Sequence, residues 1–311
     1  MLEIVSKGVF NILAQSATLQ RLASQLGTRR ATSIARRFVA GETVADAIAA
    51  ARSVESRGLL ITLDHLGEHV SSLTEAETAT REWLALIKAI IDSGIGRNIS
   101  LKLTELGLDV DKATTVDHLR KILEHADPAG FFVRLDMESS HYTDVTLEIF
   151  ETLWRQGHRQ IGVVLQAALR RSDHDLQRIA ALGGRVRLVK GAYAEPRATA
   201  YRQKAEVDAA FARLIRTALA DSDHPAIATH DEHMIELARR AALESGVTPD
   251  RFEFEMLYGV RRDLQTALAE AGYRVRVYIP FGRQWFPYFM RRLGERPANL
   301  AFAIRSVLSE N

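Results

Sequence analysis

The chain has 311 residues, of which 47% are hydrophobic and 26% are charged, and its formal net charge is +2. This is an ordinary globular composition, and the length fits either two domains or one large α/β barrel. The small net charge and the absence of a Lys/Arg block argue against nucleic-acid binding. The absence of cysteine excludes disulfides, thiolate zinc sites and cysteine nucleophiles.

The first residues do not show the charged and then apolar pattern of a signal peptide, and no apolar run approaches the length of a membrane span. We therefore expect a cytoplasmic protein without transmembrane segments. A peripheral contact with the inner face of the membrane is left open by these observations.

Residues 1–57 are predicted to be helical. Apolar residues recur at helical spacing from Val9 to Leu26, and Thr43 can cap a further helix that continues to Val54. We interpret 1–57 as an N-terminal helical extension and 58–311 as the catalytic domain.

Eight short apolar or alternating runs follow, separated by segments of helical periodicity. The runs are Leu59–Leu63, Ile99–Leu103, Phe131–Leu135, Ile161–Leu165, Val186–Val189, Ala226–Ala228, Phe252–Met256 and Val275–Ile279. The clearest helical segments between them are Val145–Trp154, Val207–Leu219 and Met234–Leu243. Strands that alternate with helices predict parallel pairing through crossover connections.

Eight strand–helix units in this length predict a (βα)8 TIM barrel. The alternative is a doubly wound open sheet, which is disfavoured because no Gly-x-Gly-x-x-Gly follows any strand.

Active sites of such barrels form where the strands end. Polar residues stand at all eight predicted ends, and they are Asp64, His65, Glu68, Lys102, Asp136, Glu138, Gln166, Arg187, Lys190, Tyr193, Thr229, His230, Asp231, Glu255 and Tyr278. A single such residue is usually a turn former or a helix cap. Eight sets on one rim, with Lys, Arg and Gln among them, favour a functional site.

Several chemistries were compared for this rim. Metal-dependent hydrolysis is disfavoured because no His-x-His stands at a strand end, and we predict no metal. Schiff-base chemistry remains open through Lys102 or Lys190 if burial depresses the pKa of the amine. Anion binding is favoured by Lys190 with Gly191 and by Thr229 with His230 at an expected helix start.

The last predicted helix carries a second basic feature. Tyr288, Arg291, Arg292 and Glu295 can share one side of it, because they are three or four residues apart. One carboxylate cannot neutralise two guanidinium groups, so the pair can bind a ligand carboxylate. Together with Lys102, the rim therefore predicts a site for a small amino acid beside a phosphate-bearing cofactor.

Four segments carry a resemblance to the proline dehydrogenase family. They are Lys190-Gly191-Ala192-Tyr193, Thr229-His230-Asp231, Phe254-Glu255-Met256-Leu257-Tyr258-Gly259, and Tyr288-Phe289-Met290-Arg291-Arg292 with Glu295, Ala298 and Asn299. The resemblance runs from about Leu59 to Asn299 in the right order. It implies a distorted (βα)8 barrel with the final helix over the mouth, and an FAD-dependent flavoprotein that oxidises L-proline to Δ1-pyrroline-5-carboxylate.

The resemblance also implies roles for individual residues. Lys102, Arg291 and Arg292 resemble the ligands of the proline carboxylate, Tyr278 and Tyr288 would wall the ring with Glu295 nearby, and Glu68 resembles the acidic partner of Arg291 that closes the site. Gln166, Arg187, Lys190, Gly191, Ala192, Thr229 and His230 match FAD-contacting positions, and Met137 matches a residue beside the flavin. Asp136 matches the active-site aspartate, either as a base or as a holder of neighbouring cations. Arg187 would stabilise the reduced flavin.

The family's chemistry implies a quinone as electron acceptor and the first step of proline catabolism. Two alternatives stay open at this point. One is a Schiff-base aldolase that uses Lys102, and the other is a non-catalytic barrel that binds an amino acid.

Overall fold

The computed structural model describes residues 35–295. Residues 1–34 and 296–311 lie outside the described part, and with them the predicted helices between Val9 and Leu26 and the positions Ala298 and Asn299.

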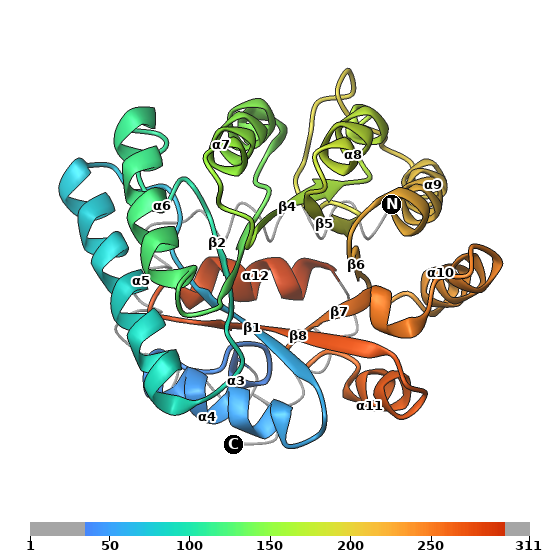
Figure 1. Ribbon diagram of the computed structural model, residues 1–311, viewed down its shortest axis with the longest axis horizontal. Helices are drawn as coiled ribbons and strands as arrows, with labels where there is room; N and C mark the ends of the chain where they lie inside the picture. Colours follow the sequence, from blue (N-terminus) through green and yellow to red (C-terminus); the bar gives the residue numbers. More distant parts are fainter. Residues whose placement is uncertain (1–34, 296–311) are drawn as a thin grey trace.

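Eight parallel strands form a closed barrel in sequence order, and β1 pairs with both β2 and β8 (Figure 1). The strands are β1 Leu60–His65, β2 Asn98–Leu101, β3 Phe132–Leu135, β4 Ile161–Gln166, β5 Arg185–Val189, β6 Ala226–Ala228, β7 Glu253–Leu257 and β8 Arg274–Phe281. The predicted barrel is confirmed. All eight predicted runs correspond to strands, and no predicted end differs from the observed one by more than two residues.

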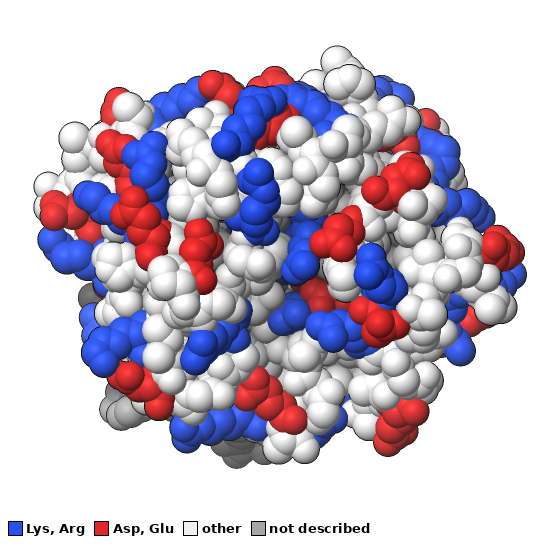
Figure 2. Space-filling model, viewed as in Figure 1, with Lys and Arg blue, Asp and Glu red and all other residues white. Residues whose placement is uncertain are grey.

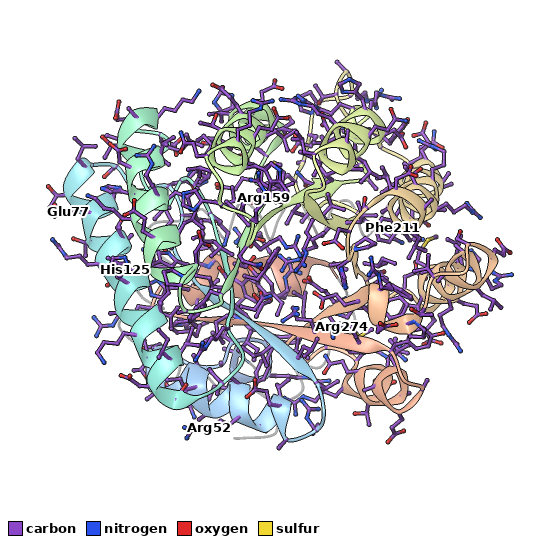
Figure 3. All side chains as sticks on the ribbon, in the orientation of Figure 1. Arg52, Glu77, His125, Arg159, Phe211 and Arg274 are labelled. Atoms are coloured by element: carbon purple, nitrogen blue, oxygen red, sulfur yellow. The ribbon has the colours of Figure 1, made fainter. Side chains whose placement is uncertain are left out.

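Helices surround the barrel and bury one face each. They are α5 Leu73–Ser93, α6 Lys112–Ala126, α7 Thr143–Arg155, α8 Ser172–Ala181, α9 Lys204–Asp221, α10 Glu232–Glu244 and α11 Arg262–Glu270, with short 3-10 turns η1 Ser140–Tyr142 and η2 Pro249–Arg251. Phe211 on α9 points toward the strands and is fully buried, whereas Glu77 on α5 points outward (Figure 3). This division follows from the apolar stripe that each helix carries.

Helix α4 (Val44–Glu55) takes the ring position between α11 and α5, where an eighth crossover helix would pack (Figure 1). It contacts β8, β1 and α5. Its start is fixed by Thr43, which forms a capping box with Asp46, so the predicted cap is confirmed. No helix that follows β8 occupies this position, because the chain after β8 forms a helix over the barrel mouth instead. The domain division at residue 57 stays a prediction, although α4 shares the barrel core.

The barrel interior is polar, unlike the branched aliphatic layers that fill most such barrels. Arg276 forms two hydrogen bonds to Glu253, with N–O distances of 2.7 and 2.9 Å, and Arg134 lies beside them. Burial alone would raise the pKa of Glu253, but Arg276 and Arg134 lower it to about 2. The charges on the inward faces of the strands are therefore paired with one another.

The final helix α12 (Trp285–Glu295) is held by the short helix α3 (Ala35–Phe38). Phe38 packs on Phe289 with ring centroids 6.4 Å apart, and Trp285 and Tyr288 belong to the same apolar cluster. The backbone after α3 is tied to the end of β8, because the N–H of Gly282 donates to the carbonyl of Gly41. Segments at opposite ends of the chain thus fix the position of α12.

Charged side chains are mixed over the face shown in Figure 2, where blue Lys and Arg alternate with red Asp and Glu. This pattern agrees with the small net charge and gives no basic footprint for nucleic acid on that face. Within residues 35–295, no helix combines the length and the apolarity needed to cross a membrane.

Candidate active site

A cavity of about 480 Å³ opens at the carboxyl ends of the strands. Every strand, or the residue directly after it, contributes to its lining, and α12 covers it with Tyr288, Arg291 and Arg292. The predicted lid position of the final helix is therefore confirmed.

Most of the predicted site residues line this cavity. They are Lys102, Asp136, Met137, Gln166, Arg187, Lys190, Gly191, Ala192, Thr229, His230, Tyr278, Tyr288, Arg291 and Arg292. Glu68 lines a small adjoining pocket under α12. Glu295 ends α12, and its side chain lies outside the described residues. The structure brings the set together, while the contacts of each residue with proline or FAD stay predictions.

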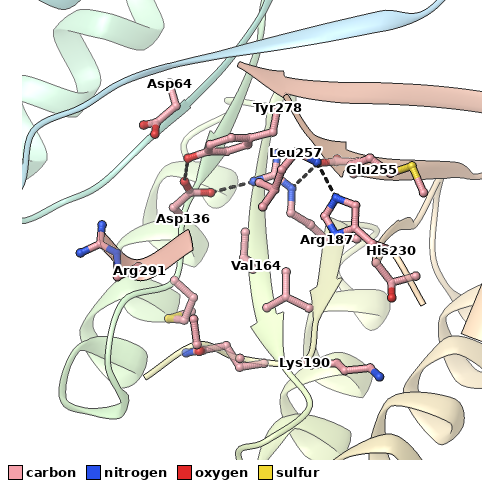
Figure 4. Close-up of a pocket in the computed structure, with 18 of the residues that line it drawn as sticks. Asp64, Asp136, Val164, Arg187, Lys190, His230, Glu255, Leu257, Tyr278 and Arg291 are labelled. Atoms are coloured by element: carbon pink, nitrogen blue, oxygen red, sulfur yellow. Dashed lines mark hydrogen bonds and ion pairs between the residues drawn. The ribbon is translucent and has the colours of Figure 1, made fainter. Parts of the chain in front are cut away.

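Asp136 is the centre of a hydrogen-bond network at the floor of the cavity (Figure 4). Its Oδ1 accepts hydrogen bonds from Arg187 Nη1 and Ser100 Oγ, both at 2.7 Å, and its Oδ2 accepts one from the Tyr278 hydroxyl at 2.6 Å. The Tyr278 hydroxyl keeps its proton, because burial and then Asp136 raise its pKa well above the ordinary value. Both carboxylate oxygens of Asp136 are thus occupied.

Arg187 is held on two edges of its guanidinium group. Its Nη1 donates to Asp136, and its Nε lies 2.5 Å from Glu255 Oε2. Nε is in ion-pair contact without hydrogen-bond geometry, and Nη2 is buried and has no hydrogen-bond partner among the described residues. Nη2 is therefore the nitrogen left for a ligand, since a buried cationic donor without a partner is costly.

Lys102 follows β2 and points into the cavity, as the alternation of Leu101 and Leu103 predicted. Its Nζ lies 3.3 Å from Asp64 Oδ1. Burial alone would lower the pKa of Lys102, but the carboxylates of Asp64, Asp136 and Glu68 raise it above the ordinary value. A Schiff-base lysine needs the opposite shift, so the aldolase interpretation is disfavoured.

The lid is joined to the barrel by an ion pair between Arg291 and Glu68. Arg291 Nη1 lies 2.8 Å from Glu68 Oε1. Burial would raise the pKa of Glu68, but Arg291 and then Lys102 hold it below the ordinary value. The pair therefore remains charged at neutral pH and connects the β1–α5 loop to α12.

Aromatic rings lie beside the cationic groups of the cavity. The Arg292 guanidinium carbon is 5.1 Å from the ring centroid of Tyr288, and that of Arg187 is 5.3 Å from the ring centroid of Tyr278. Such contacts orient guanidinium groups at modest energetic gain. Tyr278 and Tyr288 thus combine an apolar wall with a cation-binding face.

The part of the cavity lined by Gly191, Gln166 and Arg187 has features that fit a flavin cofactor. Gly191 has φ +104°, and a Cβ placed there would lie 3.2 Å from Ala168 Cβ and Gln166 Oε1. Glycine therefore lets backbone and ligand come close at this position. The amide of Gln166 and the guanidinium of Arg187 supply donors for a polar ring edge.

The anion-binding part of the rim differs from the expectation. Helix α10 begins at Glu232, directly after Thr229, His230 and Asp231, and the Asp231 carboxylate caps it by accepting from His233 N–H. Lys190 Nζ lies between Asp208 (2.6 Å) and Asp231 (2.8 Å). This helix terminus is therefore capped from within the chain, because an Asx cap satisfies its first amide groups.

His230 is oriented by the backbone. Its Nε2 accepts a hydrogen bond of 2.9 Å from the Leu257 N–H, which assigns the ring proton of the neutral form to Nδ1 (Figure 4). Thr229 supports the same loop, because its hydroxyl accepts from the Asp231 N–H.

Some contributors were missed by sequence reasoning. Ser100 stands two residues before Lys102 on the same inward face of β2, so strand alternation could have identified it. No sequence pattern indicated Asp208 on α9, which is an ion-pair partner of Lys190. Among residues 35–295, no group of acidic and histidine side chains has the arrangement of a metal site.

Comparisons with known proteins agree with this geometry. A family model described as proline dehydrogenase matches residues 47–305. The chain is similar to proline dehydrogenase 1 of Bacillus subtilis (strain 168), with 40% identity over 97% of this chain and 99% of the relative. It is 41% identical to the proline dehydrogenase of Deinococcus radiodurans over 91% of this chain and 93% of the relative.

A solved structure extends the likeness to three dimensions. Proline utilization A from Bdellovibrio bacteriovorus, inactivated by N-propargylglycine, superposes with a TM-score of 0.79 at 26% identity. The alignment covers 86% of this chain and 33% of that longer protein. The fold of this chain is therefore shared with part of that longer protein.

Proposed function

The chain belongs to the proline dehydrogenase family and is an enzyme of proline oxidation, and on this premise we propose an FAD-dependent conversion of L-proline to Δ1-pyrroline-5-carboxylate. The observation that carries the proposal is one cavity with two kinds of lining. Lys102, together with Arg291 and Arg292 of the lid, supplies three cationic side chains, and Gly191, with Gln166 and Arg187, supplies a second part with amide and guanidinium donors.

The lid half suits the carboxylate of proline. Lys102, Arg291 and Arg292 all line it, and a carboxylate accepts charge-assisted hydrogen bonds from such groups. Their positive charge disfavours a protonated ring amine, so it lowers the pKa of that amine toward the neutral form that oxidation requires. Tyr278 and Tyr288 wall the ring and exclude water.

The opposite half suits FAD. The unpartnered Arg187 Nη2, the close approach allowed at Gly191, and the polar groups of Gln166, Thr229 and His230 are the groups that would hold it. When bound, FAD would be the oxidant for removal of a hydride from C5 of proline and a proton from its amine, and a quinone would take up the two electrons. Met137 borders the same space.

Asp136 acts in this proposal as a positioning group. Its oxygens accept hydrogen bonds from Arg187, Ser100 and Tyr278, and this pairing with neighbouring side chains favours a positioning role over that of a base. It holds the cation of the flavin half and the ring wall of the proline half in one network. Orientation of this kind contributes several kcal/mol when the geometry is correct.

The proposed enzyme performs the first step of proline catabolism in the cytoplasm. Because membrane quinones are apolar, it would meet its acceptor at the inner face of the membrane.

Anaerobic titration with L-proline tests the proposal. We expect the purified protein to be yellow and its absorbance near ~450 nm, a general property of oxidised flavins, to bleach on addition of proline. A colourless protein that cannot be reconstituted with FAD would overturn the proposal. Borohydride trapping of a carbonyl substrate at Lys102 would instead support the aldolase, and tight proline binding without bleaching would support a non-catalytic barrel.

A further inference from the structure

Glu255 on β7 is a buried carboxylate for which the proposed reaction has no role. Its side chain is 2% exposed, and its Oε2 lies 2.5 Å from Arg187 Nε. Figure 4 shows Glu255 on one side of Arg187 and Asp136 on the other. The single positive charge of Arg187 therefore lies between two carboxylates.

The groups around Glu255 come from several strands. Arg134 on β3 lies 3.9 Å from its Oε1, and Glu253 and Arg276 lie deeper in the barrel and pair with each other. Burial, the largest effect, and the neighbouring Glu253 leave the pKa of Glu255 above its ordinary value, although Arg187 and Arg134 act in the opposite direction. The 2.5 Å contact between Glu255 Oε2 and Arg187 Nε is that of an ion pair.

We propose that Glu255 is a positioning residue that orients Arg187 and sets the reduction potential of the bound flavin. The inference rests on the proposed function, because it requires FAD in the half of the cavity that Arg187 lines. It goes beyond that function by assigning control of the flavin potential to a carboxylate in the cavity floor.

Arg187 and Glu255 place opposite charges in the buried interior beside the proposed flavin site. A reduced flavin is richer in electrons than an oxidised one, so a nearby cation raises the reduction potential. A carboxylate in contact with that cation offsets part of the effect, and the low dielectric of the interior keeps the offset strong. Glu255 therefore holds the potential lower than Arg187 alone would set it.

The geometry also explains why two carboxylates are present. Asp136 accepts a hydrogen bond from Nη1 of Arg187 and Glu255 forms an ion pair at Nε, so the two contacts restrain the guanidinium plane. Nη2, which takes part in neither contact, is then left for the cofactor. Removal of either Asp136 or Glu255 would allow the Arg187 guanidinium to turn toward the remaining carboxylate.

The test is the reduction potential of the flavin in Glu255→Gln holoenzyme, measured by anaerobic spectroelectrochemical titration. Glutamine keeps the shape and can accept from Nε, but it removes the negative charge. We expect a shift to a less negative potential with FAD retained. Glu255→Asp keeps the charge and should stay near the wild-type potential, while its shorter side chain lowers the limiting rate of flavin reduction about tenfold and changes the KM for proline little.

Glu253→Gln is the matched control. It changes the same residue type on the same strand and the same inward face, but its partner is Arg276. We expect a clearly smaller shift of potential. An unchanged or more negative potential in Glu255→Gln, or an equal shift in Glu253→Gln, would overturn the inference.

Reduction by dithionite needs no proline, so this test separates the two proposals. A wild-type protein that holds no FAD contradicts the proposed function itself, whereas bound FAD with an unshifted potential in Glu255→Gln contradicts only the role of Glu255. If Glu255→Gln does not fold, Glu255→Asp decides the question. A lower rate at unchanged KM and potential supports the role, and a wild-type rate overturns it.

Discussion

The floor and the lid of the cavity hold their charged groups in different ways. The floor carries Glu255, Arg187 and Tyr278 on strands, with Asp136 directly after β3. The lid carries Arg291 and Arg292 on α12, which is joined to the β1–α5 loop by an ion pair to Glu68 and packs on α3 through apolar side chains. The side chains of Arg187 and Glu255 are 5% and 2% exposed, whereas those of Arg291 and Glu68 are 23% and 21% exposed.

This difference indicates that the floor and the lid of the cavity have different roles. Groups on neighbouring strands are fixed by the sheet and by mutual pairing, which suits the constant orientation that a cofactor needs. An ion pair between a loop and a terminal helix is partly solvated and can rearrange at small cost. We therefore expect changes in the floor to affect flavin and rate, and changes in the lid to affect proline binding.

The largest effect is expected from Asp136→Ala. The change leaves Arg187 Nη1 and the Tyr278 hydroxyl without their acceptor in a buried site, which costs about 3–5 kcal/mol when one partner of a buried pair is lost. Calorimetry should show a lower Tm, and the limiting rate of flavin reduction should fall strongly. Ser100→Ala, which removes one neutral donor from the same carboxylate, is the control and should have a much smaller effect. Equal effects of the two changes would contradict the central place of Asp136.

Arg292→Met should raise the KM for proline about 10- to 100-fold, because a charge-assisted hydrogen bond to a carboxylate contributes about 1.5–3 kcal/mol. FAD content, measured by the ratio of flavin to protein absorbance, should stay at the wild-type level. Arg283→Met removes an exposed cation just before α12 and should change neither quantity. Loss of FAD without a change in KM would mean that Arg292 binds the cofactor and not proline.

Much of the floor could be predicted from the sequence. Strands of a parallel barrel are buried on both sides, so they read as short apolar runs, and polar residues at their ends stand out. This is how Asp136, Gln166 and Arg187 were found. Their pairing was not predictable, because the contact of Arg187 with Glu255 depends on the register of strands distant in sequence.

Gly259→Ala probes the support of the lid. A Cβ at this position would lie 1.6 Å from the Arg37 carbonyl oxygen, so α3 and then α12 must shift. We expect an overpacking cost of about 1–3 kcal/mol in stability and a several-fold rise in KM.

The control for this change is Gly272→Ala. Gly272 also has positive φ, +86°, but no atom lies within 4 Å of a Cβ built there. It shares the backbone strain without the collision, so it should lower the Tm less and leave the KM unchanged. A rise in KM for both variants would mean that general destabilisation, not the position of α12, is responsible.

The smallest effect is expected from Glu68→Gln. A partly exposed ion pair contributes up to about 1 kcal/mol, so the KM should change only a few-fold and respond to salt. The folded-state pKa of Glu68 is depressed, so the stabilisation by the pair is present above the unfolded pKa of about 4.3 and is lost as pH falls through the lower folded pKa.

Thermal unfolding measured from pH 7 down to pH 3 should therefore show a difference between Glu68→Gln and the wild type that disappears only in acid. Glu77→Gln, at an exposed pair on α5, is the reference for an ordinary surface charge. A difference that vanished already near neutral pH would contradict a depressed pKa for Glu68.

The lid was less predictable than the floor. The cations of α12 were visible as an Arg-Arg pair, but an isolated pair of this kind is usually a solvated surface feature. The contact of α3 with α12 joins residues about 250 positions apart, and the occupation of the eighth ring position by α4 follows from the path of the chain after β8. Neither leaves a local pattern in the sequence.

Rapid anaerobic mixing of proline with Arg292→Met and Glu255→Asp holoenzymes tests the division between lid and floor most directly. The dependence of the flavin-reduction rate on proline concentration gives an apparent Kd and a limiting rate for each protein. The account predicts that the lid variant raises the apparent Kd with a nearly unchanged limiting rate, and that the floor variant lowers the limiting rate with a nearly unchanged Kd. If both variants changed the same parameter, the two halves of the cavity would not have the separate roles assigned to them.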